Sequence, residues 1–192
     1  MRALPNMKVL TPGSKIETDI AIKIMFQYQG PFYIRLGKAP SKDFYNNIPN
    51  YQIGDGNIVK QGKDVLLICA GNILENVFEV ANNLEKQGLS IQIVSYLCIK
   101  PVNKKFLIEL ANHFKKIITI EEHSEIGGLG STISDILMES KLPKIYFKKI
   151  ALSDKSHLEI GNQKYLREIN DLGIESMKNK ILEFILQNNE KI

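Results

Sequence analysis

The residues best suited to catalysis or binding lie close together in the sequence. They are Glu121, Glu122 and His123, followed by GGLGS at 127–131. The stretch KIITIE at 116–121 has the apolar pattern of a strand, and GGLGS leads into residues with helical apolar spacing. Ligands of open α/β sheets bind at the carboxyl ends of strands, and free N–H groups at a helix start attract anions. A small-molecule or anion site is therefore one hypothesis. However, the glycine spacing is not GxGxxG, and no acidic residue stands out as a ribose anchor.

A second pair of chemically interesting residues is Arg35 and Lys38, at the end of the predicted strand FYIRL at 32–36. The odd step between the two cations predicts that they face opposite ways. Cations here could bind an anion or simply be solvated.

The two cysteines, Cys69 and Cys98, lie inside apolar runs without a histidine nearby. That setting predicts buried, reduced thiols rather than a zinc site or a disulfide framework.

Composition excludes several classes of partner. The 192 residues carry a net charge of +4, and their lysines and arginines are scattered without the aromatic clustering of a nucleic-acid interface. The longest apolar run, VLLICA at 65–70, is far too short to span a membrane. The N-terminus lacks a signal core. We therefore expect a cytoplasmic protein with neither nucleic acid nor membrane as partner.

From residue 63 onward, strand and helix patterns alternate at short spacing, which predicts an α/β fold. The expected strands are 65–70, 91–97, 116–121 and 144–150. Expected helices follow Gly71–Asn72, Asn103 and GGLG, and two more lie at 162–170 and 174–187. Such βαβ units predict a mainly parallel sheet covered by helices on both faces, a three-layer α/β/α domain.

The first part of the chain has a different organisation. KVL at 8–10 is a short strand candidate, and Ser14 and Glu17 have the spacing of a capping box that opens a helix over 15–28. Residues 37–62 are rich in glycine, proline and asparagine and have no sustained period, which is typical of a linker. We therefore expect three parts: a first unit at residues 1–45, a linker at 46–60 and the three-layer domain at 61–192.

Five segments in order carry a family resemblance: MRALPNMKVLTPG, GPFYIRLGK, GKDVLLICAGN, IKP and EEHSEIGGLGS. Together they resemble the last third of a transketolase. By this resemblance, residues 1–45 are a remnant of the pyrimidine-binding domain and residues 61–192 are the transketolase C-terminal domain. Transketolases are transferases of carbohydrate metabolism that move two-carbon ketol units between sugar phosphates, using thiamine diphosphate and a divalent metal.

The resemblance also implies what this chain lacks. The cofactor, the metal, the catalytic glutamate and the sugar-handling histidines belong to regions upstream of Met1 in the family. The chain should therefore act in assembly and be inactive alone, with upstream transketolase domains or a separate N-terminal subunit as partner, in a dimer or other homo-oligomer. GDG at 54–56 with Asn82–Asn83 resembles the metal motif of thiamine enzymes. However, GDG lies in the expected linker and the asparagines inside a helix, so we expect no metal site.

One family role matches a residue of this chain. Transketolases place an arginine that binds the substrate phosphate where this sequence has Lys38, and Arg35 is the second candidate. Three alternatives remain open. Deoxyxylulose-phosphate synthases share the architecture, but they carry a second arginine in a YPRG-like context where this chain has LGK. A free-standing anion or nucleotide binder would use the helix start at 127–131, and an interaction module would need neither site.

Overall fold

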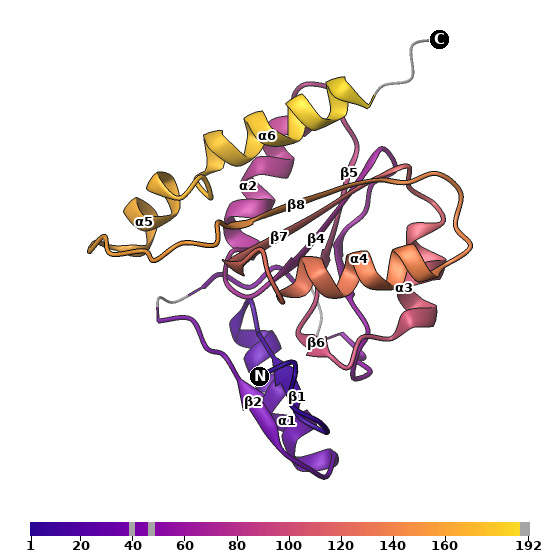
Figure 1. Cartoon of the computed structure of the whole chain (residues 1–192), viewed down its shortest axis with the longest axis vertical. Coiled ribbons are helices and arrows are strands. Elements are labelled where there is room, and N and C mark those ends of the chain that lie inside the picture. Colours follow the sequence, from indigo (N-terminus) through magenta and orange to yellow (C-terminus); the bar gives the residue numbers. More distant parts are fainter. Residues whose placement is uncertain (39–40, 46–48, 189–192) are drawn as a thin grey trace.

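The computed structural model describes residues 1–38, 41–45 and 49–188. Its elements divide into a small N-terminal lobe and a larger domain built on a five-stranded sheet (Figure 1). The strands are β1 Lys8–Leu10, β2 Phe32–Ile34, β3 Asn57–Lys60, β4 Val65–Ala70, β5 Ile91–Ser95, β6 Cys98–Lys100, β7 Lys116–Ser124 and β8 Tyr146–Leu152. The helices are α1 Lys15–Gln27, α2 Leu74–Glu85, α3 Lys104–Ala111, α4 Leu129–Glu139, α5 Gln163–Ile169 and α6 Ile174–Gln187. None of the helices within these ranges is long and apolar enough to cross a membrane.

The larger domain is the expected three-layer α/β/α structure. Its strand order is β3-β5-β4-β7-β8, with every pairing parallel except the antiparallel pair β3–β5. Alternate residues of β4 serve two separate cores: Leu67 and Cys69 pack with α2 and α6, and Leu66 and Ile68 pack with α3 and α4. A strand covered on both faces needs the continuous apolar run seen in its sequence.

Strand β3 departs from the sequence-based expectation. Residues 46–60 are expected as a linker, but Asn57–Lys60 pair with β5 at the edge of the large sheet. The register shifts between Ile58 and Lys60, so the strand does not show a clean alternation of apolar and polar residues. A four-residue strand with an irregular register leaves little periodic signal in a sequence.

The N-terminal lobe is built on a second sheet with the order β2-β1-β6. Strand β1 is parallel to β2 and antiparallel to β6, and β6 comes from the larger part of the chain, directly after β5. The core of the lobe is therefore built from residues of both parts of the chain. Leu10, Ile20 and Ile24 form one buried cluster with Leu97 and Cys98. The lobe therefore covers its apolar residues with the help of the C-terminal part.

The helix α1 begins as the capping box predicts, except that the Glu17 carboxylate bonds to the N–H of Gly13 and not to that of Ser14. The side chain of Ser14 accepts a hydrogen bond from the Glu17 N–H (3.2 Å). The Glu17 carboxylate accepts from the N–H of Gly13 (2.6 Å), one residue ahead of the cap. Gly13 lies so close to Gly71 that a Cβ on it would be 2.7 Å from the Gly71 carbonyl oxygen. This close approach joins the end of β1 to the end of β4.

Candidate functional site

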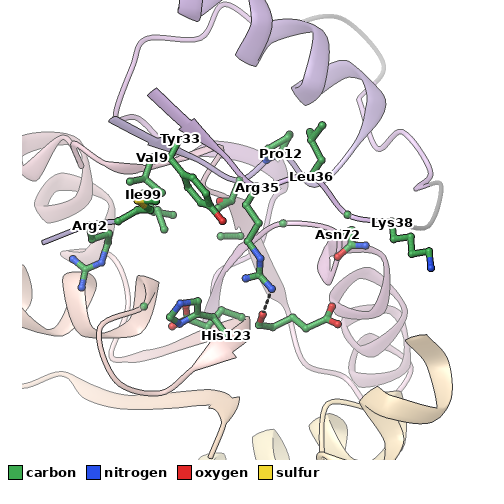
Figure 2. A pocket seen from close by; sticks show the side chains of 18 of the residues that line it. Arg2, Val9, Pro12, Tyr33, Arg35, Leu36, Lys38, Asn72, Ile99 and His123 are labelled. Carbon is green, nitrogen blue, oxygen red and sulfur yellow. Dashed lines mark hydrogen bonds between the residues drawn. The ribbon is translucent and has the colours of Figure 1, made fainter. Parts of the chain in front are cut away.

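A cavity of about 790 Å³ lies between the N-terminal lobe and the carboxyl edge of the large sheet (Figure 2). Its floor includes Ala70–Asn72, which follow β4, and Glu121–His123, which end β7. Strand β5, which follows β4 in the chain, lies on one side of β4, and β7 and β8 lie on its other side. The cavity therefore lies where the strand order reverses, between β4 and β7. That reversal point is where open α/β sheets bind ligands. The residues following β1 and β2 form the opposite wall.

The helix start at 127–131 is not open to an external anion. Glu121 is 4% exposed, and its two carboxylate oxygens accept the N–H groups of Leu129 and Gly130, each at 2.7 Å. Burial raises the pKa of Glu121, while these N–H donors oppose that rise. Gly128 gives the carboxylate room, because a Cβ there would lie 2.1 Å from its oxygen. The chain thus supplies its own carboxylate at this helix start, which counts against the hypothesis of an external anion there.

Glu122 belongs to a different polar network, centred on Arg167 of α5. Arg167 is 7% exposed, and its Nε and Nη2 atoms donate to one Glu122 oxygen at 3.1 and 2.7 Å. The same guanidinium donates to the side-chain oxygens of Asn72 and Asn76, both at 3.1 Å. The network therefore ties α5 to the ends of β4 and β7. Arg167 does not stand out in the sequence, because one arginine in a short, weakly periodic helix resembles any solvated charge.

The two predicted phosphate candidates take opposite directions, as their spacing predicts. Figure 2 shows the Arg35 side chain reaching into the cavity and that of Lys38 pointing away from it. One Arg35 nitrogen donates to the Glu122 carbonyl oxygen at 2.8 Å. Within the described part of the chain, no hydrogen bond or ion pair engages the Lys38 ammonium group, although Lys38 stands at the cavity rim. Both cations thus line the same cavity, but their side chains are turned apart, with Lys38 at the rim.

Two further polar side chains, Arg2 and His123, line the cavity wall. Arg2 donates from Nε to the Gly127 carbonyl oxygen at 2.7 Å. The Nδ1 atom of His123 lies 3.0 Å from the Ser124 carbonyl oxygen, which can only accept. This contact requires a proton on Nδ1 and engages it with the backbone. His123 is a candidate from sequence alone, whereas Arg2 has no distinguishing sequence context.

The two halves of the metal-like motif have separate hydrogen-bond partners. Asp55 accepts a hydrogen bond from the Asn103 side chain at 2.7 Å and so fixes the turn before α3. Asn82 lies in α2, where its oxygen accepts from Lys60 at 3.4 Å. The two oxygens lie at opposite ends of β3 and do not converge on one cation. Across residues 1–38, 41–45 and 49–188, no group of three His, Cys, Asp or Glu side chains is placed to hold a metal.

A buried acid joins the two parts of the chain near the cavity. Glu17 is 0% exposed and accepts from the Gly13 N–H and from the Tyr45 hydroxyl group. Burial raises the pKa of Glu17, and its hydrogen bonds only partly oppose the rise. In the sequence, Glu17 has the spacing of an ordinary helix-capping residue. Its neighbours in sequence do not indicate that Asn57 of β3 and Ser95 of β5 lie beside it in the fold.

Fold and cavity together define a three-layer α/β domain whose carboxyl sheet edge is covered by the small N-terminal lobe. The family comparison then identifies it: the chain belongs to the transketolase C-terminal domain family, whose model matches residues 54–168. The predicted resemblance and fold class are thereby confirmed. The match begins ahead of β3, so that strand falls inside the family domain.

Individual relatives extend the likeness across nearly the whole chain. It is 28% identical to one subunit of the apulose-4-phosphate transketolase of Phocaeicola vulgatus, over 96% of this chain and 58% of that protein. It is 31% identical to the 1-deoxy-D-xylulose-5-phosphate synthase of Halothermothrix orenii, over 97% of this chain and 29% of that protein. A solved split-gene transketolase, described as an inactive tetramer, superposes with a TM-score of 0.87 at 28% identity, over 98% of this chain and 61% of that one. The chain thus spans less than two thirds of each of these proteins.

Proposed function

We propose that this chain supplies the C-terminal part of a transketolase-type enzyme that transfers two-carbon ketol units between sugar phosphates. The main support is the match, along nearly the whole chain, to one subunit of a transketolase and to a split-gene transketolase. The upstream domains come from a separate subunit or from the rest of a longer protein. The chain itself acts in assembly, within a cytoplasmic homo-oligomer such as a dimer.

The cofactor requirement supports this division of labour. Thiamine diphosphate and its divalent metal need a diphosphate cradle and converging oxygen ligands. Asp55 and Asn82, the nearest sequence match to a metal motif, are both committed to other partners. We therefore assign cofactor binding to the upstream domains.

Reconstitution tests the proposal. The chain is purified alone and also mixed with the polypeptide that carries the upstream domains, and ketol transfer between sugar phosphates is measured in both samples. The mixture should transfer the ketol unit, and the chain alone should neither do so nor bind thiamine diphosphate in calorimetry. Ketol transfer or micromolar cofactor binding by the chain alone would contradict the proposed division.

Within that complex, we assign the substrate phosphate to Lys38. Its ammonium group points away from the cavity and is free of partners among the described residues, so it is available to a ligand at the lobe surface. A charge-assisted hydrogen bond contributes roughly 1.5–3 kcal/mol. Lys38→Ala should therefore weaken the use of phosphorylated sugars by about tenfold to a hundredfold, mainly in apparent affinity. Lys38→Arg should preserve it, because the guanidinium fork suits phosphate.

Unphosphorylated sugars provide the control for Lys38. They should be nearly indifferent to either substitution, because they lack the group that Lys38 binds. An equal loss for phosphorylated and unphosphorylated sugars would show that Lys38 is structural. Arg35→Ala should have the smaller effect, since its side chain is turned into the cavity.

A second candidate function is synthesis of 1-deoxy-D-xylulose 5-phosphate, favoured by the 31% identity to the Halothermothrix orenii synthase. The same reconstituted enzyme distinguishes the two functions by its product. The alternative of a free-standing anion or nucleotide binder at 127–131 is weakened, because Glu121 occupies the helix start.

A further inference from the structure

The connection between the N-terminal lobe and the large domain contains a short segment, residues 42–45, that contacts both of them. Two of its side chains engage α2 of the large domain. The Lys42 ammonium group lies 2.7 Å from a carboxylate oxygen of Glu75, and the Phe44 ring stacks on the ring of Phe78 with 4.4 Å between the centroids. Because Lys42 is largely exposed, its ion pair stabilises the contact little. The aromatic stack is therefore the main attachment on this side.

The other two side chains of this segment engage α1 of the lobe. Asp43 accepts the N–H of Ile16 at 2.9 Å, a group in the first turn of α1 that has no partner within the helix. The Tyr45 hydroxyl group donates to the Glu17 carboxylate. Even-numbered residues thus contact the large domain and odd-numbered residues contact the lobe. We call residues 42–45 the strap.

The Glu17 carboxylate is the point at which the strap, the lobe and the large domain meet. Glu17 belongs to α1, bonds to Tyr45 of the strap, and has Asn57 of β3 and Ser95 of β5 beside it. Its side chain is fully buried, so water cannot replace a hydrogen bond that is lost there. Loss of the Tyr45 donor would therefore weaken the joint between the two parts of the chain.

The lobe elements held by the strap also form part of the wall of the sheet-edge cavity. Thr11 and Pro12 line the cavity and lie between β1 and α1. Movement of the lobe away from the large domain would carry this wall with it. The same movement would uncover Cys98 of β6, which is buried in one cluster with Ile20 and Ile24 of α1.

We propose that the strap holds the lobe over the sheet-edge cavity, and that release of the strap opens the cavity while the large domain stays folded. The core between the sheet and the helices α2 and α6 supports the second half of this proposal, because all its buried residues come from the large domain. Opening separates α1 and β1 from β6 and leaves that core intact. The device involves only this chain and is independent of ketol transfer.

Labelling of the two native cysteines with a thiol reagent tests the strap. Cys98 reports separation of α1 from β6, and Cys69 reports unfolding of the core beneath α2. Both should react slowly in the parent chain. Tyr45→Phe removes only the donor to Glu17; it should speed the labelling of Cys98 about tenfold and leave that of Cys69 unchanged. The matched control is Tyr28→Phe, which removes the same group from an exposed tyrosine at the end of α1 and should change neither rate.

Hydrogen exchange followed by mass spectrometry provides a second readout. In Tyr45→Phe, α1 and residues 9–14 should exchange faster, while α2 and β4 should keep the parent rates. Asp43→Ala should act in the same direction, and Asp43→Asn should act less, because asparagine keeps an acceptor for the Ile16 N–H. The proposal is overturned if Tyr45→Phe leaves the labelling rate of Cys98 at the control value. It is also overturned if both cysteines accelerate by the same factor, since the whole chain would then be destabilised. Neither result depends on whether the reconstituted enzyme transfers ketol units.

Discussion

Replacing Arg167 by methionine should detach α5 from the cavity floor. The substitution keeps an unbranched side chain in the space and removes the charge and every donor. It leaves the Glu122 carboxylate without its ion-pair partner at 2.7 Å. It also removes the donors to Asn72 and Asn76. The expected result is a less stable protein in which α5 is loosened first.

The size of the loss follows from how deeply the pair is buried. Breaking a buried ion pair by removing one partner costs about 3–5 kcal/mol. Here the arginine side chain is 8% exposed but the glutamate side chain is 27% exposed, so Glu122 can regain some hydration. Two neutral acceptors also lose bonds worth about 1 kcal/mol each. We expect a net loss of about 2–4 kcal/mol in the free energy of unfolding.

Urea unfolding followed by circular dichroism measures this loss, and thermal unfolding should show a fall of about 4–16 °C for a chain of this size. The matched control is Arg35→Met, which removes an exposed arginine with one bond to a backbone carbonyl and should cost less than about 1 kcal/mol. If Arg167→Met costs no more than Arg35→Met, the network does not stabilise the cavity floor. A double-mutant cycle with Glu122→Gln should show coupling between the two side chains.

Three further outcomes test other parts of the structure. Because burial raises the pKa of Glu17, the folded chain keeps a proton that the unfolded chain releases; stability should fall as pH rises above about 4.5, and urea titrations of Glu17→Gln should lack that slope. Cys69 and Cys98 should resist thiol reagents until the chain unfolds, since both are fully buried and burial raises the pKa of Cys98 to about 12; fast labelling of native protein would contradict their placement. Deleting residues 1–45 should expose the Leu97 and Cys98 cluster and cause aggregation or unfolding in size-exclusion chromatography, whereas a well-behaved monomer would show that the lobe core is dispensable.

Much of the fold could be predicted from local pattern. The apolar run at 65–70 predicts a buried strand, and the spacing of Ile174, Ile181 and Ile185 predicts the last helix with its observed bounds. Both signals arise because burial repeats with the period of the element itself. The order of five sequence segments was sufficient to indicate the family, which the comparisons confirmed.

The roles of the site residues depended on contacts between distant parts of the chain. The sequence places Glu121 before a glycine-rich helix start, but only the fold shows the carboxylate turned onto that start, where it replaces an external anion. Nothing local marks Arg167 as buried, because its partners lie more than forty residues away in sequence. In the same way, β6 was not expected, because its three residues become a strand only by pairing with β1.

The sequence by itself thus determined the order of the elements, the mainly parallel sheet and the family. The tertiary structure decided which charged side chains face the cavity and which are paired with other groups of the chain. The physical reason is that periodicity records whether a side chain is covered, but not what covers it. Arg35 and Lys38 are similar cations three residues apart, and only the fold directs one of them to the Glu122 carbonyl group and the other to the surface of the lobe.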